Sequence, residues 1–217
     1  MNPSARRPQK LPRQTAEDSA SRRIVTAARR HFFAHGFRTV TMDELAEEVG
    51  MSKKTLYLAF ASKTDLIRAV LLDKFREVDS ELERIIADPP VSAMDSLQQL
   101  LACMQRHTAE IQPPFVRDIR REAPEIFELV QSLRRELIQR YFGKLFEQGR
   151  RSGIFRKDIS TQLMIEILLG ATESIVNPSK LAELGLTVKA GYLTVVNVIL
   201  EGVLAKNKKS RNLHSRR

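Results

Sequence analysis

The sequence predicts an all-α protein with a small N-terminal helical domain and a larger C-terminal helical domain. Apolar residues recur three and four positions apart along nearly all of its 217 residues, and no segment alternates polar and apolar residues for more than a few positions. Pro89 and Pro90 interrupt the helical pattern, because neither can continue a helix and each restricts the residue before it. We place the domain boundary at these two prolines.

Composition indicates a folded protein that we expect in the cytoplasm. The hydrophobic fraction is 42%. No run approaches the roughly 18 apolar residues that a membrane-spanning helix needs, and charged residues lie where a signal peptide is apolar. The single cysteine, Cys103, excludes an intrachain disulfide and a four-cysteine zinc site. We expect no cofactor, no bound metal and no contact with a membrane.

The net charge of +10 comes entirely from the two ends of the chain. Residues 1–15 carry four basic residues and no acid, and residues 206–217 carry six basic residues and no acid. Such segments are typical of disordered arms, which can attract phosphates without reading sequence. Solvated tails without a function explain them equally well, so the net charge does not identify a nucleic-acid partner.

Four helices are predicted before the boundary. The first runs from about Glu17 to His35 and ends at Gly36. The segment 41–44, Thr-Met-Asp-Glu, is a capping box that begins a short helix through about Val49. Ser52 caps a third helix, over about 53–59, and the segment 62–65 begins a fourth that reaches about residue 87.

Five helices are predicted beyond the boundary. We expect breaks at Pro113-Pro114, at Pro124, between Gly149 and Gly153, and at Asn177-Pro178. The helices between these breaks cover about 92–110, 115–122, 124–151, 160–176 and 186–205.

The two short helices 42–49 and 53–59 have the spacing of a helix-turn-helix. Taken alone, this spacing also fits an ordinary helical hairpin in a core. The polar residues in the first turns of the second helix favour the first interpretation, because that end enters the major groove of DNA when such a helix docks. There lysine can donate to guanine, threonine can contact bases, and the Tyr57 hydroxyl can donate to a phosphate. Lys63 begins the next helix, where backbone donors and the helix dipole favour an anion.

Residues from about 22 to 66 resemble the DNA-binding domain of the TetR family of repressors. The matching residues are Ala28, Phe32, Gly36, Phe37, Thr39, Val40, Thr41, Leu45, Ala46, Val49, Gly50, Ser52, Thr55, Leu56, Tyr57, Phe60, Ser62, Lys63 and Leu66. The resemblance implies that Thr41, Tyr57 and Lys63 hold phosphates, and that Lys53, Lys54 and Thr55 face bases. The family often has glycine at the position of Lys54, and histidine or tyrosine at that of Ala59, so the operator sequence stays open.

The resemblance also implies a division of the chain. It comprises a basic arm over 1–16, a helix-turn-helix domain over 17–66 with a connecting helix to about 87, an effector-binding and dimerisation domain over 88–205, and a basic tail over 206–217. In the family, the last two helices pair with those of a second copy. Their apolar residues here fit that use, although both helices could also be plain core.

The effector site is the least specific part of the prediction. Apolar and aromatic residues at helical spacing could line a cavity, although most such residues are core; the candidates are Met104, His107, Phe115, Phe127, Phe142 and Phe146. Arg117, Arg120 and Arg121 fit a solvated face, with an acidic effector as the alternative. Cys103 and His107 lie one turn apart, but a soft-metal site needs further cysteine or histidine ligands.

We expect a ligand-responsive transcriptional regulator, a repressor that binds a palindromic operator as a homodimer and is released by a small-molecule effector. The alternative is a helical ligand-binding or adaptor protein of the same fold that does not read DNA. An enzyme is not expected, because the sequence contains no nucleophile elbow, phosphate-binding glycine loop or zinc-protease motif.

Overall fold

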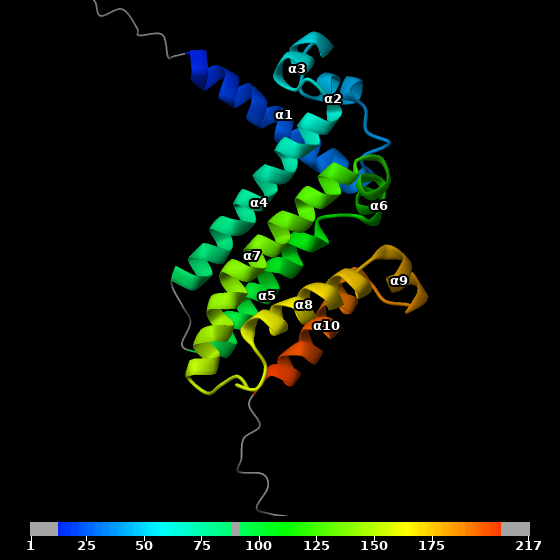
Figure 1. The fold of residues 1–217 in the computed structure, drawn as a ribbon. Helices are drawn as coiled ribbons and strands as arrows, with labels where there is room; N and C mark the ends of the chain where they lie inside the picture. The colour runs from blue at the N-terminus through cyan, green and yellow to red at the C-terminus, as the bar shows by residue number, and fades with distance from the viewer. Residues whose placement is uncertain (1–12, 88–91, 205–217) are drawn as a thin grey trace, which may run out of the picture.

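The computed structural model describes residues 13–87 and 92–204, and within these ranges the chain forms ten α-helices (Figure 1). The helices are α1 (Arg13–His35), α2 (Met42–Glu48), α3 (Lys53–Ala59), α4 (Lys63–Ala87), α5 (Ala93–Ala109), α6 (Pro113–Glu122), α7 (Pro124–Arg151), α8 (Thr161–Ile175), α9 (Pro178–Glu183) and α10 (Val188–Val203). The only extended pairing in the described ranges is an isolated bridge between Phe155 and Leu204. The all-α prediction is confirmed.

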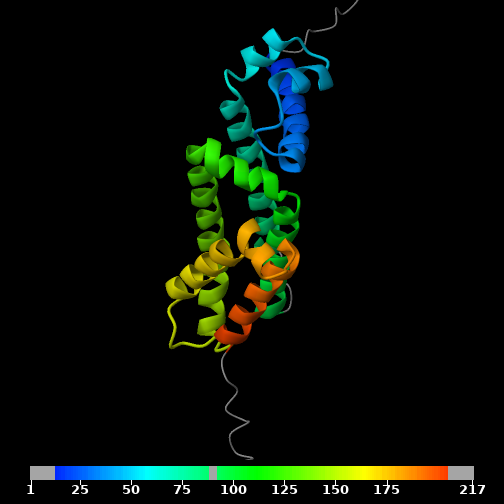
Figure 2. The ribbon, with the colours of Figure 1, turned by 90° about the vertical axis from the view of Figure 1, so that its right-hand side faces the viewer.

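Helices α1 to α3 lie at one end of an elongated molecule, and the long helix α4 runs from this end along the rest (Figures 1 and 2). We call α1, α2, α3 and the first turns of α4 the head. Its short helices begin where the sequence predicts. Thr41 forms a complete capping box with Glu44, and the Ser52 side chain accepts the Thr55 backbone N–H.

The remaining helices form a layered bundle beyond the head. Helices α4, α5 and α7 pack along one another, and α8 and α10 cross them as a pair (Figures 1 and 2). The core of this bundle is apolar and aromatic. It includes Leu82, Leu100, Phe142, Phe146 and Phe155.

A second core fills the head, and it extends further along the chain than expected. Besides Ile24, Phe32, Leu45 and Leu56, it contains buried residues of α6 and α7. Helix α6 therefore packs against the head although it follows α5 in the sequence. The burial of apolar side chains thus joins the head to the bundle through α4 and α6.

Three predicted breaks are helix starts in the structure. Pro113, Pro124 and Pro178 occupy the first turns of α6, α7 and α9. Proline ends a helix that precedes it, but its fixed φ and missing N–H suit the first turn of a new one. The sequence analysis did not predict α9; its N-cap is Asn177, whose side chain accepts the Lys180 backbone N–H at 2.9 Å.

Some predictions concern residues that the structure does not describe. The boundary prolines Pro89 and Pro90 and most of both basic arms lie outside the described ranges. Within those ranges, no helix is long and apolar enough to cross a membrane.

Candidate nucleic-acid interface and internal cavity

The turn between α2 and α3 presents α3 on the surface of the head. Gly50 adopts a φ of 66°, a left-handed conformation that favours glycine, and the Met51 backbone N–H donates to the Ala46 carbonyl. Leu45 and Leu56 are buried where the two helices meet. One face of α3 is thereby anchored in the head core, and the opposite face is left to solvent.

The exposed face of α3 carries most of the residues predicted to contact DNA. Lys53, Lys54, Thr55 and Tyr57 are all exposed, with 41% of Tyr57 accessible. Leu58 is 79% exposed on the same helix, although it is apolar. The sequence analysis missed Leu58. Its position two residues after the buried Leu56 is the signal that could have placed it on the open face.

Lys53 and Lys54, the two lysines of α3, differ in their ion pairs. The Lys53 ammonium lies 2.7 Å from an Asp43 carboxylate oxygen, and this hydrogen bond raises the pKa of Lys53. Lys54 has no ion pair within the described part of the chain. Lys53 can therefore contact a base only after its ion pair with Asp43 breaks, whereas Lys54 can contact a base without breaking an ion pair.

Thr41 and Lys63 lie at the starts of α2 and α4. The Thr41 hydroxyl donates to a Glu44 carboxylate oxygen at 2.9 Å. The Lys63 ammonium lies 4.6 Å from the centre of the Phe37 ring and donates to the Arg38 carbonyl at 3.4 Å. Burial against these groups lowers the pKa of Lys63. Both side chains thus lie at helix N-termini, which favour anions.

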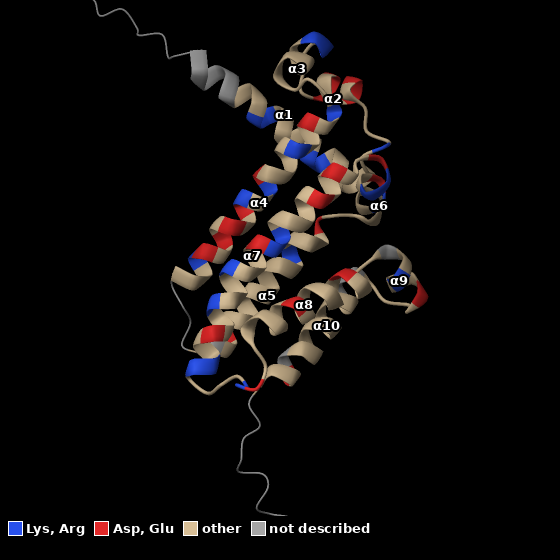
Figure 3. Ribbon diagram, viewed as in Figure 1, with Lys and Arg blue, Asp and Glu red and all other residues tan. Residues whose placement is uncertain are grey.

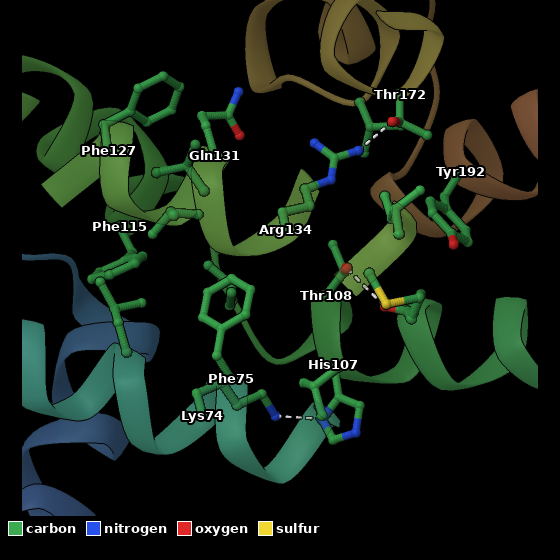
Figure 4. A pocket seen from close by; sticks show the side chains of 18 of the residues that line it. Lys74, Phe75, His107, Thr108, Phe115, Phe127, Gln131, Arg134, Thr172 and Tyr192 are labelled. Carbon is green, nitrogen blue, oxygen red and sulfur yellow. Dashed lines mark hydrogen bonds between the residues drawn. The ribbon is translucent and has the colours of Figure 1, made fainter. Parts of the chain in front are cut away.

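A cavity of about 210 Å³ lies inside the bundle (Figure 4). Residues of α4, α5, α6, α7, α8 and α10 line it, and most of them are apolar. Five of the six predicted effector residues are among them: Met104, His107, Phe115, Phe127 and Phe142. Phe146 is not; it packs against Phe142 and Phe155 in the bundle core.

The cavity also contains polar residues that the sequence analysis did not select, including Lys74, Gln131 and Arg134. Gln131 and Arg134 interrupt an apolar stripe on α7 that runs through Phe127, Ile138 and Phe142 at helical spacing. Polar residues on such a stripe are the signal that could have found them. The predicted arginines Arg117, Arg120 and Arg121 are instead exposed on α6, and none of them lines the cavity.

Buried Lys74 is part of an ionic network at one wall of the cavity (Figure 4). Its ammonium lies 2.6 Å from His107 Nδ1 and 2.6 Å from a Glu110 carboxylate oxygen. Arg29 of α1 also pairs with Glu110, at 2.7 Å. Burial opposes the charge of Glu110, but hydrogen bonds from Lys74 and Arg29 lower its pKa. The network connects the cavity wall to the head.

Cys103 and His107 gain a carboxylate neighbour, Glu81, that the sequence analysis did not foresee. His107 Nε2 lies 2.8 Å from Glu81, and its Nδ1 faces Lys74. Burial raises the pKa of Cys103 to about 12, so the thiol is protonated. Because both ring nitrogens of His107 already have hydrogen-bond partners, we assign no metal to this cluster.

Helix α6 joins the cavity to the head directly. Phe115 and Ile119 line the cavity from one of its faces. Buried Asp118, on another face, accepts the Arg38 backbone N–H at 3.0 Å, and the Gln112 backbone N–H donates to the Phe33 carbonyl at 3.0 Å. The sequence analysis named only α4 as a connector.

The head carries an exposed helix-turn-helix, and the bundle joined to it contains a mainly apolar cavity. These two features place the protein in the class of two-part helix-turn-helix proteins. Residues 24–70 match the family described as "Bacterial regulatory proteins, tetR family". The head of this chain is therefore similar to the DNA-binding segment of that family. The predicted resemblance of residues from about 22 to 66 to this family is confirmed.

Individual relatives are distant. The chain is 30% identical over 112 residues to the probable HTH-type transcriptional regulator ArpR of Pseudomonas putida, a match that covers 50% of this chain and spans about half (49%) of that relative. It is 23% identical over 198 residues to the HTH-type transcriptional regulator UidR of Escherichia coli, covering 88% of this chain and 96% of UidR. The fold is similar to that of the fatty acid degradation regulator FadR from Bacillus halodurans, with a TM-score of 0.63 at 17% identity over 92% of this chain and 100% of FadR.

Proposed function

We propose that the protein is a ligand-responsive DNA-binding transcriptional regulator, which binds a palindromic operator as a homodimer, represses transcription and is released by a small-molecule effector. The observation that carries this proposal is the face of α3, where Lys53, Lys54, Thr55 and Tyr57 are exposed while Leu56 is buried beneath them. A helix anchored in this way can enter a major groove without disturbing the head core.

The proposed contacts divide into two kinds. Lys53, Lys54 and Thr55 face base edges, where lysine donates to guanine and threonine contacts either edge or a thymine methyl group. Thr41, Tyr57 and Lys63 hold backbone phosphates on either side of α3 and set its position in the groove. Leu58 is added to the first group, because an exposed apolar side chain on this face suits a thymine methyl group.

An apolar surface on α8 and α10 supports the homodimer. Leu163 and Ile167 of α8 are 51% and 46% exposed, and Val198 of α10 is 66% exposed. The visible parts of both helices are mostly uncharged (Figure 3). Two copies that bury this surface against each other form a symmetric, self-complementary interface, and the resulting dimer carries two α3 helices for two half-sites.

The proposed release step runs through α6. An effector in the cavity contacts Phe115 and Ile119, and the same helix contacts the head through Asp118 and Gln112. A shift of α6 therefore moves the α1–α2 loop and, with it, the spacing between the two α3 helices of the dimer. Release follows only if the effector binds the DNA-free arrangement more tightly than the DNA-bound one.

We retain the division into a DNA-binding domain over 17–66 and an effector domain over 88–205 as part of this proposal. The shared packing of α6 supports a coupling between these two domains. The alternative, a ligand-binding or adaptor protein that no longer reads DNA, gives no reason for the polar exposed face of α3.

The proposal is tested by incubating the purified full chain with fragments of its own genome at physiological salt and sequencing the retained DNA. We expect a small set of fragments to be retained over random DNA of equal length. As a matched control, the double variant Lys54→Ala, Tyr57→Ala keeps the buried Leu56 and is expected to lose this preference. Equal retention of genomic and random fragments by the unaltered protein would contradict the proposal.

A further inference from the structure

Arg134 is a charged side chain inside an otherwise mainly apolar cavity. It extends from α7 into the cavity, where its guanidinium donates to the Thr172 hydroxyl (Figure 4). Among the described residues, no carboxylate oxygen lies within 4.0 Å of its nitrogens, whereas the next residue, Arg135, pairs with Glu166 at 2.8 Å. Arg134 thus has no paired carboxylate among the described residues, and Glu173 attracts it only from a longer distance.

This arrangement has a free-energy cost that an anion would remove. A guanidinium stays charged in proteins and has five N–H donors in a planar fork, most of which Thr172 leaves unused. Burial of a charge without a partner is unfavourable, and burial lowers the pKa of Arg134 accordingly. A carboxylate matches the fork with two parallel hydrogen bonds.

Lys74, the other cation in the cavity wall, already has an anionic partner. Its ammonium already contacts Glu110 and His107, each at 2.6 Å. Lys74 is therefore neutralised by the protein, and the unsatisfied positive charge is at the Arg134 end of the cavity.

The remaining lining of the cavity is mainly apolar, and it determines which ligand body fits beside Arg134. Phe75, Phe127 and Phe142 supply aromatic surfaces, and Ile138 and Leu168 supply aliphatic ones. The cavity volume of about 210 Å³ exceeds the roughly 150 Å³ that accepts benzene in an engineered apolar cavity. A substituted single ring or a short alkyl chain fits this space.

A second hollow, between α7 and α8 and more open to solvent, shares Phe127, Gln131 and Arg134 with the cavity. Arg134 therefore lies between the outer surface and the apolar interior. Glu173 lines this hollow but does not come within ion-pair distance of Arg134. The position suits a ligand whose apolar body enters first and whose charged end stops at Arg134.

We propose that the cavity binds a small organic monocarboxylate, with its apolar body among the phenylalanines and its carboxylate paired with the Arg134 guanidinium. This inference rests on the proposed function, because it names the chemical class of the effector for the same cavity. It assigns Arg134, rather than the exposed arginines of α6, as the anion-binding residue.

The test is isothermal titration calorimetry of the full chain, in the absence of DNA, with two matched pairs of probes. The pairs are 4-propylbenzoate with 4-propylbenzamide, and hexanoate with hexanamide, and each differs mainly in charge. We expect at least one carboxylate to bind about tenfold or more tightly than its amide, since hydrogen bonds to charged groups are the stronger ones. If neither acid binds, or if the amides bind as tightly as the acids, the proposal is wrong.

Two variants separate binding by Arg134 from a merely structural role. We expect Arg134→Gln to remove the preference for acid over amide, and Arg135→Gln, the matched control on the same helix, to keep it. If Arg134→Gln lowers the melting temperature but keeps the preference, Arg134 only supports the packing of α7 on α8 and the proposal is overturned. The comparison on the unaltered chain decides the matter even if Arg134→Gln does not fold.

The outcomes are independent of the DNA-binding proposal. Retention of specific genomic fragments without binding of any acid would remove this inference and leave the regulator intact. Binding of an acid without retention of specific fragments would remove the regulator and leave the carboxylate site.

Discussion

At the scale of single residues, the cations near α3 differ in the intramolecular contacts that they must break to bind DNA. Lys53 must leave Asp43, and Lys63 must leave the Phe37 ring and the Arg38 carbonyl. Lys54 leaves no partner within the described residues. We therefore expect Lys54 to contribute most to the choice of bases, and Lys63 to contribute a sequence-independent phosphate contact.

The role of Lys63 leads to a prediction about salt. Lys63→Ala is expected to weaken binding to every DNA sequence alike and to reduce the slope of log affinity against log salt by about one, because one phosphate contact is lost. Fluorescence anisotropy on one operator and one random duplex across a salt series measures this. Lys63→Arg restores the charge and should restore the slope. A loss confined to the operator would show that Lys63 reads bases.

At the scale of the elements, helix α6 and the α1–α2 loop fit closely together. Gly36 has a φ of 97°, and a Cβ at this position would lie 2.6 Å from an Asp118 carboxylate oxygen. Gly50 also has a left-handed φ, of 66°, but a Cβ there would meet nothing within 4 Å. Both glycines thus have a left-handed backbone, but the φ of Gly36 lies further from the values that other residues adopt, and only at Gly36 is there no room for a side chain.

We predict that Gly50→Ala lowers the free energy of unfolding by about 1 kcal/mol, from the left-handed backbone alone. Gly36→Ala should cost at least about 1 kcal/mol more, because its φ of 97° suits alanine less well and because its methyl group displaces Asp118 from the Arg38 N–H. Urea unfolding followed by circular dichroism compares the two variants directly. Equal losses of unfolding free energy would mean that α6 does not pack closely against the α1–α2 loop. The proposed route from the cavity to the head would then lack its main contact.

The elements that the sequence predicted well are those whose ends are marked locally. Capping residues mark the starts of α2, α3 and α4, so these helices could be placed within a residue or two. Helix α9 was missed because Pro178 was interpreted as a break, although proline also suits a first turn.

The residues that were missed depend on contacts between distant segments. The apolar stripe of α7 pointed to Phe127 and Phe142 and could have pointed to Arg134. Nothing local shows, however, that Arg134 lacks a carboxylate partner among the described residues whereas Arg135 has one. In the same way, the contact of Asp118 with Arg38 joins residues 80 positions apart. Such contacts follow from the packing of α6 and α7 and have no signature in a short stretch of sequence.

At the scale of the whole molecule, the proposed function depends on three surfaces: the exposed face of α3, the cavity and the apolar faces of α8 and α10. The cavity contacts the head through α6 and through the network of Lys74, Glu110 and Arg29. In the proposed function, the apolar faces pair with a second copy, as a symmetric operator would require. Each surface is of little use without the other two, which is why we assign them to one regulatory cycle.

In the proposed function, two copies of α3 read bases in symmetric half-sites. The most direct measurement is selection from a random DNA pool with the unaltered chain and with Lys54→Ala. We predict a palindromic motif with half-site centres about 10 base pairs, or a multiple of that, apart, and a changed preference at the same position of both half-sites for Lys54→Ala. An unenriched pool, or the same motif from both proteins, would contradict the claim.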